Sequence, residues 1–294
     1  MSARVLVIGD VMLDVVVRPS APIAPTSDTP SRVRVGRGGS AANVAVALRA
    51  ASPGSEVVFA GICGEDAAAQ IVRSDLEGAG VLAQLTRVAG ATGVVVSVVA
   101  QSGERSMMTD RGVNGRLLFE HVSSLLDESV SHVHISGYTV LDNDTRSLVS
   151  RLIAAATAVG ASTSVDVCSV GPLREMGVEV FTRCAAGSTM LFANEEEALA
   201  LSREDDVLAA LEGLADQWRE VVITRGANGA IARRDANAFE VSARVIDVVD
   251  TTGAGDCATG TYLAHRLGGE DVATSLEHAM EAAAQVVRVL GSRG

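Results

Sequence analysis

The sequence contains no lysine, and arginine supplies all 24 of its basic residues. This absence excludes several kinds of site. A Walker A loop needs a lysine to reach the β- and γ-phosphates of a nucleotide, and Schiff-base catalysis and the protein-kinase ATP site need one as well. We therefore expect any phosphate group bound by this chain to be held by backbone amides, arginine and metal ions.

Aromatic residues are also scarce, at 3% of the chain, although 48% of its residues are apolar. Alanine and valine must therefore supply most of the core packing. The length of 294 residues is enough for one large α/β domain, with or without a small appendage. The net charge of −12 argues against nucleic acid as the main partner, because phosphate contacts need a basic surface.

The four cysteines are widely separated, and no pair has the C-x-x-C spacing of a zinc or redox motif. Scattered thiols of this kind fit a reducing cytoplasm better than a disulfide framework. No apolar run approaches the length of a membrane span, and the N-terminus leads into a predicted strand rather than a secretion signal. We therefore expect a cytoplasmic protein with no membrane partner.

Apolar runs alternate with helical patterns along most of the chain. The first run, Val5 to Gly9, ends in glycine and is typical of a strand buried on both faces. Repeated strand–helix units predict an α/β fold with a mostly parallel sheet covered by helices. The pattern predicts, among others, helices at 117–126, 144–159 and 276–290 and strands at 131–135, 189–193 and 245–249.

Two segments, 11–36 and 91–110, interrupt this alternation. Both consist of half-polar strand patterns, and the first also contains a proline-rich connection. We interpret them as a small β-sheet that forms a lid on the main domain, which then comprises residues 1–10, 37–90 and 111–294.

The most informative motif is Asp250-Thr251-Thr252-Gly253-Ala254-Gly255-Asp256, between the strand predicted at 245–249 and a helix predicted at 257–267. Amides left free by the two glycines, together with the positive end of the helix dipole, favour the binding of an anion. Asp256 on its own would be interpreted as a helix cap. Because it directly follows an anion-binding turn, we interpret it as a base that takes the proton of a hydroxyl attacking a phosphoryl group.

A second cluster, Gly38, Gly39 and Asn43, opens another predicted helix. It is either a simple turn or a site where glycines admit a polyol to the backbone and Asn43 offers a donor and an acceptor to its hydroxyls. Asp10 and Asp14 follow the first strand, at the edge where α/β sheets bind ligands. Asp14 lies on the predicted lid and is placed to accept hydrogen bonds from sugar hydroxyls.

Three further groups have both a structural and a functional interpretation. Asn194 and Glu197 form either a helix cap or a site that holds hydrated Mg²⁺ near phosphates. The segment 224–229 is either a tight turn or a loop that contacts a nucleotide. His132 and His134 share one face of a predicted strand, and without a third ligand we interpret them as core or edge histidines.

In this order, the motifs resemble those of the ribokinase-like (PfkB) carbohydrate kinases. The resemblance spans nearly the whole chain, and it is carried by Gly9-Asp10 to Asp14, Gly38 to Asn43, Gly61 to Asp66, Asp110 to Asn114, Asn194-x-x-Glu197, Thr224-Arg225-Gly226 and Asp250 to Asp256. The last motif is the most specific. The resemblance implies an α/β fold built as a three-layer sandwich with a mostly parallel central sheet and a small β-sheet lid, often used as a dimer contact.

The resemblance also implies roles for individual residues. Asp256 would be the base, and the anion hole would be formed by the amides of Gly253, Ala254 and Gly255. The sugar would contact Asp14, Gly38, Gly39 and Asn43. Asn194 and Glu197 would act through Mg²⁺ and phosphate, Thr224 and Gly226 would line the ATP site, and Asp250 and Thr252 would belong to a K⁺ site.

We therefore expect an ATP-dependent kinase, a homodimer through its lid, that phosphorylates a hydroxymethyl group of a ribose- or fructose-like sugar. The main alternative is a nucleoside kinase for adenosine, cytidine or pseudouridine. The few aromatic side chains favour a sugar, although Tyr138 follows a strand end and is placed to stack on a base. A phosphorylated sugar is a further alternative, with Arg105 and Arg111 as candidate phosphate ligands.

A function of another class, a non-catalytic sugar or nucleotide sensor, would require loss of the base or the anion hole, and both are intact. A dinucleotide-dependent oxidoreductase is disfavoured, because no glycine fingerprint follows the first strand.

Overall fold

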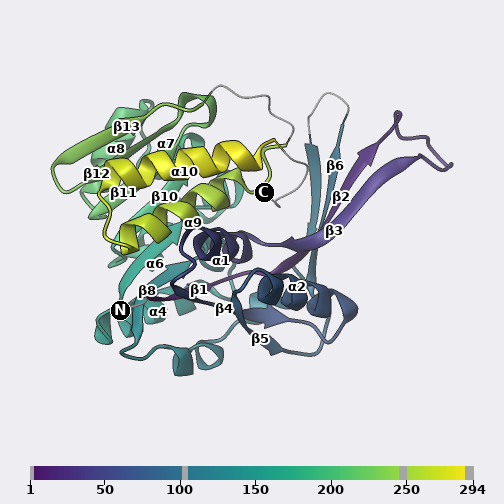
Figure 1. The fold of residues 1–294 in the computed structure, drawn as a ribbon, viewed down its shortest axis with the longest axis horizontal. Coiled ribbons are helices and arrows are strands. Elements are labelled where there is room, and N and C mark those ends of the chain that lie inside the picture. Colours follow the sequence, from purple (N-terminus) through teal and green to yellow (C-terminus); the bar gives the residue numbers. More distant parts are fainter. Residues whose placement is uncertain (1–2, 101–104, 245–249, 289–294) are drawn as a thin grey trace.

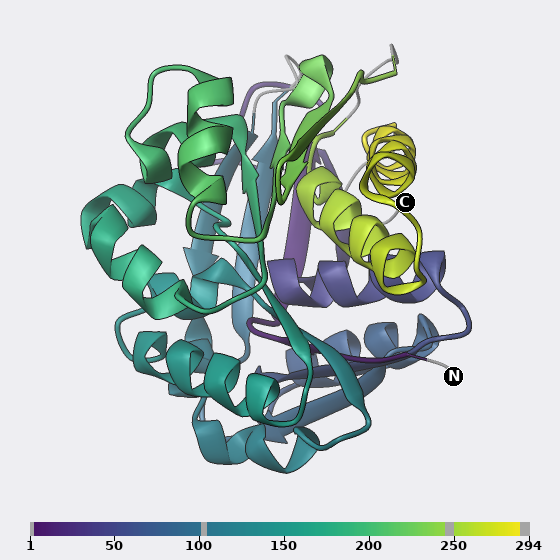
Figure 2. The same ribbon diagram turned by 90° about the vertical axis from the view of Figure 1, so that its left-hand side faces the viewer.

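The computed structural model of this chain describes residues 3–100, 105–244 and 250–288. They form two β-sheets, and helices cover both faces of the larger one (Figures 1 and 2). The α/β sandwich and the separate small sheet expected from the sequence are both confirmed. The strand predicted at 245–249 lies outside the described residues.

The larger sheet has nine strands in the order β13-β12-β11-β10-β9-β8-β1-β4-β5. All neighbouring pairs are parallel except at one edge, where β12 runs antiparallel to both β11 and β13. The strands are β1 (Arg4–Ile8), β4 (Glu56–Cys63), β5 (Leu82–Arg87), β8 (Val130–Ile135), β9 (Ser162–Asp166), β10 (Met190–Asn194), β11 (Glu220–Thr224), β12 (Ala230–Arg234) and β13 (Asn237–Val241).

Each face of this sheet packs against its own set of helices. One face is covered by α1 (Ser40–Ala51), α2 (Ala67–Gly78), α9 (Ala254–Leu267) and α10 (Val272–Val286). The other is covered by α3 (Gly137–Leu141), α4 (Arg146–Ala158), α5 (Val170–Met176), α6 (Val178–Ala185), α7 (Glu195–Ser202) and α8 (Val207–Ala215). Figure 2 shows the two helical layers on either side of the strands.

Side-chain alternation along each central strand feeds two separate cores. In β1, Leu6 and Ile8 belong to the core beneath α4, whereas Val5 and Val7 belong to the core beneath α1 and α9. A strand buried on both faces needs an apolar residue at every position. This requirement explains why the continuous run from Val5 to Ile8 could be recognised in the sequence.

The smaller sheet projects from the main body (Figure 1). Its strand order is β3-β2-β6-β7, with β2 (Met12–Pro19), β3 (Ser31–Gly38), β6 (Gly93–Val99) and β7 (Arg105–Asp110). The central pair, β2 and β6, is parallel, and the outer strands are antiparallel to them. Apolar side chains on the outer strands are about half exposed, namely Val33, Val35, Met107 and Met108.

The prediction of a helix at 117–126 is wrong. The segment instead contains two short 3-10 turns, Phe119–His121 and Ser123–Leu125. Only Leu117 and Val122 are fully buried there. Their separation of five residues does not match the three- or four-residue spacing of a helical face, so an α-helix would not bury both.

The last helix begins earlier than predicted, at Val272 rather than at 276. Its N-terminus is fixed by Asp271, whose carboxylate accepts a hydrogen bond of 2.8 Å from the amide of Thr274. The strands β5 and β13 and the short helices α3, α5 and α6 were not predicted. These elements are only five to eight residues long, shorter than the window over which hydrophobic periodicity can be recognised in a sequence.

Close contact between α1 and α9 depends on Gly260. A methyl group added at this position would lie 2.5 Å from the carbonyl oxygen of Val44 and 2.8 Å from the amide nitrogen of Leu48. Both are backbone atoms of α1, which cannot move aside as the end of a flexible side chain can. The missing side chain therefore sets the distance between the two helices.

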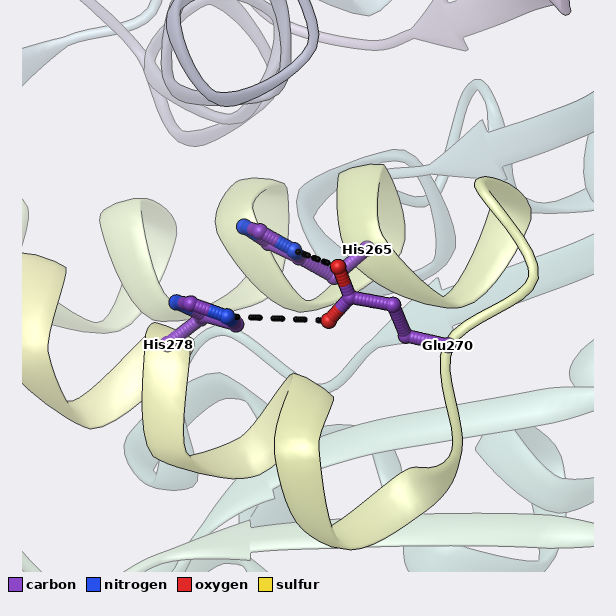
Figure 3. A group of neighbouring side chains, drawn as sticks. All are labelled: His265, Glu270 and His278. Carbon is purple, nitrogen blue, oxygen red and sulfur yellow. Dashed lines mark ion pairs between the residues drawn. The ribbon is translucent and has the colours of Figure 1, made fainter.

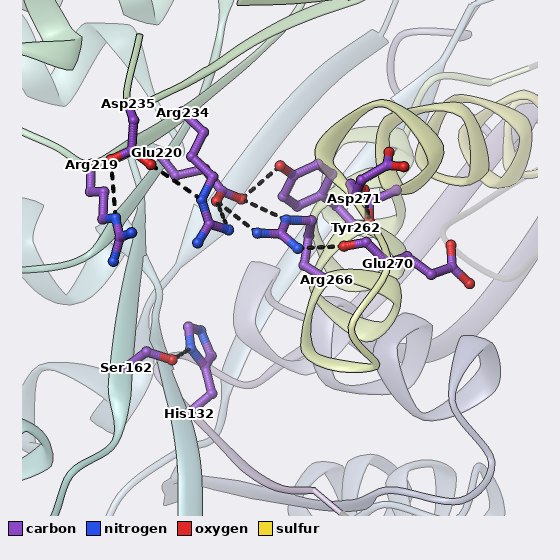
Figure 4. A network of polar contacts seen from close by, with 11 residues as sticks. His132, Ser162, Arg219, Glu220, Arg234, Asp235, Tyr262, Arg266, Glu270 and Asp271 are labelled. Atoms are coloured by element: carbon purple, nitrogen blue, oxygen red, sulfur yellow. Dashed lines mark hydrogen bonds and ion pairs between the residues drawn. The ribbon is translucent and has the colours of Figure 1, made fainter. Parts of the chain in front are cut away.

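The C-terminal half of α9 is fixed to the sheet by the buried carboxylate of Glu220, at the start of β11 (Figure 4). This carboxylate accepts hydrogen bonds from the hydroxyl of Tyr262 at 2.7 Å and from Nε and Nη2 of Arg266, each at 3.1 Å. Arg234 of β12 donates a further bond of 3.0 Å. Two arginines neutralise a charge that would be costly if it were buried alone.

The packing predicts opposite effects for two glycine-to-alanine substitutions. Gly260→Ala should lower the free energy of unfolding by about 1–3 kcal/mol, because the methyl group overpacks the contact between α1 and α9. Gly213→Ala in α8, where no atom beyond the adjacent helix backbone lies within 4 Å of the added carbon, should raise stability by about 0.5–1 kcal/mol. Thermal unfolding of both variants tests the pair, and a Gly260→Ala protein as stable as the parent would contradict the close contact.

Candidate functional site

A cavity of about 640 Å³ opens at the carboxyl ends of the parallel strands. Its walls come from the ends of β9, β10 and β11, the start of α7, the first turn of α9 and the inner face of α10. This is the edge where open α/β sheets bind ligands, and the volume suits a nucleotide-sized molecule. The predicted residues that line it are Asn194, Glu197, Thr224, Gly226, Gly253, Ala254, Gly255 and Asp256.

Asp256 lies in the first turn of α9 and faces this cavity. Its two carboxylate oxygens accept hydrogen bonds from the Ser40 hydroxyl at 2.8 Å and from the Asn43 side-chain amide at 2.9 Å. Both donors lie on the first turn of α1, so the contact between α1 and α9 holds the carboxylate in place. Burial raises the pKa of Asp256 to about 6, which still leaves it ionised at neutral pH.

The anion-binding turn begins with Gly253, whose backbone is left-handed with φ at 77°. The helix starts at Ala254, three residues before the predicted start at Cys257, so the Gly-Ala-Gly segment joins the helix itself. The Ala254 amide donates to the Thr251 carbonyl at 3.3 Å. Amides later in the first turn of a helix have no acceptor within the helix, and here that turn borders the cavity.

The predicted sugar-binding residues lie on the small sheet and the start of α1, next to Asp256. Asp14 projects from β2 against Gly38, where an added methyl carbon would lie 1.9 Å from a carboxylate oxygen. At Gly39, with φ at 91°, the same carbon would lie 2.6 Å from the carbonyl of Asp10. Glycine at these two positions is therefore required for two acidic residues to approach the start of α1.

Buried cationic charge is supplied to this half of the site by Arg37, which sequence reasoning missed. The residue is only 7% exposed, and its guanidinium donates to the Asn43 side-chain oxygen at 2.8 Å. Both polar ends of Asn43 are thus bonded to protein groups, Arg37 on one side and Asp256 on the other. Arg37 follows the exposed Arg32 and Arg34 along β3, in a segment whose sequence indicated only a half-polar strand.

Asp14 carries a strongly perturbed carboxyl group. Burial, followed by the nearby charges of Asp256 and Asp10, raises the pKa of Asp14 to about 7, and the charge of Arg37 opposes this rise. Asp10 is itself buried and accepts a hydrogen bond of 3.1 Å from the Ser136 hydroxyl. We call the half of the site formed by the small sheet and the start of α1 the acceptor side. The negative charge of its acidic groups therefore exceeds the positive charge that Arg37 supplies.

The opposite wall holds two further carboxylates. Asn194 and Glu197 form the predicted helix cap, each side chain accepting a hydrogen bond of 2.9 Å from the other residue's amide. Glu197 nevertheless lines the cavity, and burial raises its pKa to about 7. Asp166, at the end of β9, also lines it, and burial together with the charges of Glu197 and Asp256 raises the pKa of Asp166 well above its ordinary value.

Asp166 was not identified from the sequence, although it ends a predicted strand at the ligand-binding edge. Its carboxylate accepts hydrogen bonds from the Cys168 amide at 3.0 Å and from the Thr259 hydroxyl at 3.3 Å. Carboxylate oxygens are the donors that Mg²⁺ prefers. The mutual repulsion of Asp166, Glu197 and Asp256 would be relieved by a divalent cation, so the donor set fits this ion.

Of the remaining predicted residues, Thr224 and Gly226 line the cavity, whereas Asp250 and Thr252 lie on either side of Thr251, which lines it. Thr224 and Gly226 border it where β11 meets a 3-10 turn, opposite apolar residues of α10 such as Met280 and Ala284. Asp250 is buried, and one of its oxygens accepts hydrogen bonds from the Thr252 amide at 2.9 Å and hydroxyl at 2.6 Å. The loop offers oxygen ligands suited to a cation such as K⁺.

Two other groups singled out in the sequence are now placed. His132 and His134 are fully buried, and their rings hydrogen-bond the hydroxyls of Ser162 and Ser164, as expected of core histidines. The guanidinium of Arg111 lies 5.4 Å from the centre of the Tyr138 ring and forms an ion pair of 3.3 Å with Asp142.

No helix in the described part of the chain is both long enough and apolar enough to span a bilayer.

Comparisons with known proteins agree with this geometry. The family model for pfkB family carbohydrate kinases matches residues 2–294. The chain is 31% identical to an ATP-dependent ribose-1-phosphate kinase from Halopiger xanaduensis, over 94% of this chain and 89% of that protein. Adenosine kinase from Sinorhizobium meliloti superposes with a TM-score of 0.88 at 25% identity, over 100% of this chain and 96% of that one.

A third match concerns the fold alone. A candidate ribokinase II from E. coli, solved in complex with ATP and Mg²⁺, superposes with a TM-score of 0.87 at 22% identity, over 99% of this chain and 94% of that one. The family match extends through the anion-binding turn and Asp256, and the relative from Halopiger xanaduensis is similar along almost its whole length. The chain therefore belongs to the pfkB family of carbohydrate kinases.

Proposed function

We propose that this chain is an ATP-dependent carbohydrate kinase that transfers the γ-phosphoryl group to a hydroxymethyl group of a ribose- or fructose-like sugar. The observation that carries the proposal is the position of Asp256. Its carboxylate faces the cavity from the first turn of α9 and is oriented by Ser40 and Asn43. A proton acceptor and the amides of a helix N-terminus thus share one turn of one helix.

In the proposed reaction, Asp256 takes the proton of the sugar hydroxyl as the oxygen attacks the γ-phosphorus. With a pKa of about 6, the carboxylate is ionised at neutral pH and is a stronger base than an ordinary aspartate. The amides of Gly253, Ala254 and Gly255 would stabilise the charge that develops on the transferred group, and for Ala254 this requires its amide to leave the Thr251 carbonyl. Removal of the proton and stabilisation of the phosphoryl oxygens therefore occur within one turn of α9.

ATP would occupy the cavity between Thr224, Gly226 and α10, with its phosphates directed to the turn at Gly253. Asn194, Glu197 and Asp166 would hold Mg²⁺, through water or directly. When bound there, Mg²⁺ would neutralise negative charge on the phosphates. The E. coli structure in complex with ATP and Mg²⁺ supports this pair of cofactors. Asp250 and Thr252 are proposed as part of a K⁺ site behind the turn.

Asp14, Gly38, Gly39 and Asn43 are proposed to bind the sugar. Residues 11–36 and 91–110 would form a lid that closes over it, on a main domain of residues 1–10, 37–90 and 111–294. Closure would exclude water, which would otherwise compete with the sugar hydroxyl for the phosphoryl group.

We further propose a cytoplasmic homodimer. The half-exposed Val33, Val35, Met107 and Met108 of the small sheet would be covered in such a dimer. The free cysteines of the described residues fit a reducing compartment.

Replacement of the base should separate binding from chemistry. Asp256→Asn preserves the shape of the side chain, and we expect it to retain ATP binding while phosphoryl transfer falls by about 10²- to 10⁴-fold. Calorimetric titration with ATP and a coupled assay of ADP release measure the two properties. Asp205→Asn, at an exposed position, is the matched control and should resemble the parent. Turnover near the parent value in Asp256→Asn would contradict the role of the base.

Asp14 should contribute to sugar binding at a cost in stability. Its raised pKa means that the cost is absent below its unfolded pKa of about 4, grows between pH 4 and 7, and is complete above pH 7. Asp14→Asn should therefore raise the KM for the sugar and also stabilise the ligand-free protein, by about 1–3 kcal/mol at pH 8 and by less at pH 5.

Thermal unfolding of Asp14→Asn at both pH values, with Asp28→Asn as an exposed control, tests this linkage. A gain in stability that did not increase with pH would exclude the proposed electrostatic cost. An unchanged KM would exclude contact between Asp14 and the sugar.

A substrate panel distinguishes the candidate reactions. We expect ADP release with ribose or fructose, or with their phosphates, to exceed that with adenosine and cytidine, and we expect K⁺ to increase the rate. Ribose 1-phosphate belongs in the panel because the Halopiger xanaduensis relative is a ribose-1-phosphate kinase and because Arg111, beside Tyr138, is a candidate phosphate ligand. Adenosine as the best acceptor would favour a nucleoside kinase, and no turnover on any compound would favour a sensor.

A further inference from the structure

A second group of potential ligands lies far along α9 from Asp256. It consists of His265 near the end of α9, Glu270 in the following turn and His278 on α10 (Figure 3). One ligand atom from each residue lies within 4.8 Å of the other two. Nδ1 of His265 is 3.0 Å from one Glu270 oxygen, and Nε2 of His278 is 3.6 Å from the other.

The turn between the two helices brings these residues together. The amide of Glu270 donates to the His265 carbonyl at 3.1 Å, and Gly269 has a φ of 97°, which reverses the chain direction. Arg266 also donates to the backbone carbonyl of Glu270. The two imidazole rings are stacked, with centres 3.9 Å apart and planes inclined by only 9°. Backbone and ring contacts therefore hold the three side chains on one side of the helix pair.

Contacts among the three side chains leave one hydrogen-bond acceptor of the group without a donor. Among the described residues, the second carboxylate oxygen of Glu270 is buried without a hydrogen-bond partner. Its distance of 3.6 Å from His278 exceeds that of a hydrogen bond. A buried acceptor without a donor is unfavourable, and two imidazole nitrogens directed at the same carboxylate form a set of nitrogen and oxygen ligands.

We propose that His265, Glu270 and His278 bind a divalent transition metal of the Zn²⁺ type. Two imidazoles and one carboxylate are typical zinc ligands, and three protein ligands leave a fourth position for water. Imidazole ligands select Zn²⁺, Ni²⁺ or Cu²⁺ over the Mg²⁺ used in phosphoryl transfer. This inference does not depend on the proposed function.

Metal binding requires the ligands to move closer together. Zinc lies about 2.0–2.2 Å from nitrogen and oxygen ligands, so the ligand atoms must converge from their present spacing, and the stacked rings must rotate toward one another. The His278 and Glu270 side chains are 44% and 40% exposed, which gives them room to rotate and gives the metal access from solvent. The more buried His265 would remain the fixed member of the site.

A metal held here would join the end of α9 to the second turn of α10. The first turn of α9 carries Asp256, and α10 supplies Met280 and Ala284 to the cavity wall. The metal would therefore stabilise the helix pair that forms one side of the nucleotide site. Because the unfolded chain lacks the preformed site, binding should raise the unfolding temperature.

The test uses the whole protein without a histidine tag, titrated with Zn²⁺ in a calorimeter in the presence of excess Mg²⁺. Excess Mg²⁺ competes with Zn²⁺ for the carboxylates of the nucleotide cavity. It competes poorly for imidazole nitrogens, so Zn²⁺ binding that remains reports on the histidine group. We expect about one Zn²⁺ per chain and an increase of a few degrees in unfolding temperature.

The matched variants are His278→Ala and Glu270→Gln, with His121→Ala as a histidine control outside the group. Alanine is a good helix former at the half-exposed position 278, so the first variant should fold. Each site variant should weaken Zn²⁺ binding by at least about tenfold and remove the thermal shift, whereas His121→Ala should bind as the parent does. Failure of the parent to bind Zn²⁺, or equal binding by the parent and both site variants, would overturn the proposal.

Discussion

The site depends on the convergence of four partly or fully buried carboxylates around one cavity. Asp14, Asp166, Glu197 and Asp256 come from separate elements, and burial raises the pKa of each. Such a group is unfavourable unless cations or hydrogen-bond donors oppose the charge. Arg37 provides buried positive charge on the acceptor side, and the side facing α7 is suited to a metal ion. Repulsion between these carboxylates is therefore a cost of folding, and the same repulsion favours the binding of the metal ion that the proposed reaction needs.

The helix pair of α1 and α9 makes this arrangement rigid. Gly260 brings the two backbones together, which places Ser40 and Asn43 within hydrogen-bonding distance of Asp256. At the far end of α9, Glu220 binds Tyr262 and Arg266. One helix is therefore fixed at both ends by polar contacts, while apolar packing on the sheet supports its middle.

Sequence reasoning found the features that depend on local pattern. The run from Val5 to Ile8 and the Gly253–Asp256 turn each have a signature within a few residues, and the structure contains both the strand and the turn. Sequence reasoning missed features that depend on contacts between segments far apart in the sequence. Arg37 follows the exposed Arg32 and Arg34 on the same strand, and its burial depends on other elements, such as its contact with Asn43 of α1. Asp166 gains its surroundings from α7 and α9, which no local pattern reveals.

The continuity of β3 with α1 has a mechanical consequence. Gly38 is the last residue of the strand, Ser40 is the first of the helix, and Gly39 alone separates them. Any rotation of the small sheet about this junction must be absorbed at Gly39 or transmitted to Ser40 and Asn43. Hydrogen bonds from those two side chains lower the basicity of the Asp256 carboxylate. The angle of the small sheet and the proton affinity of the carboxylate are therefore geometrically coupled through one glycine.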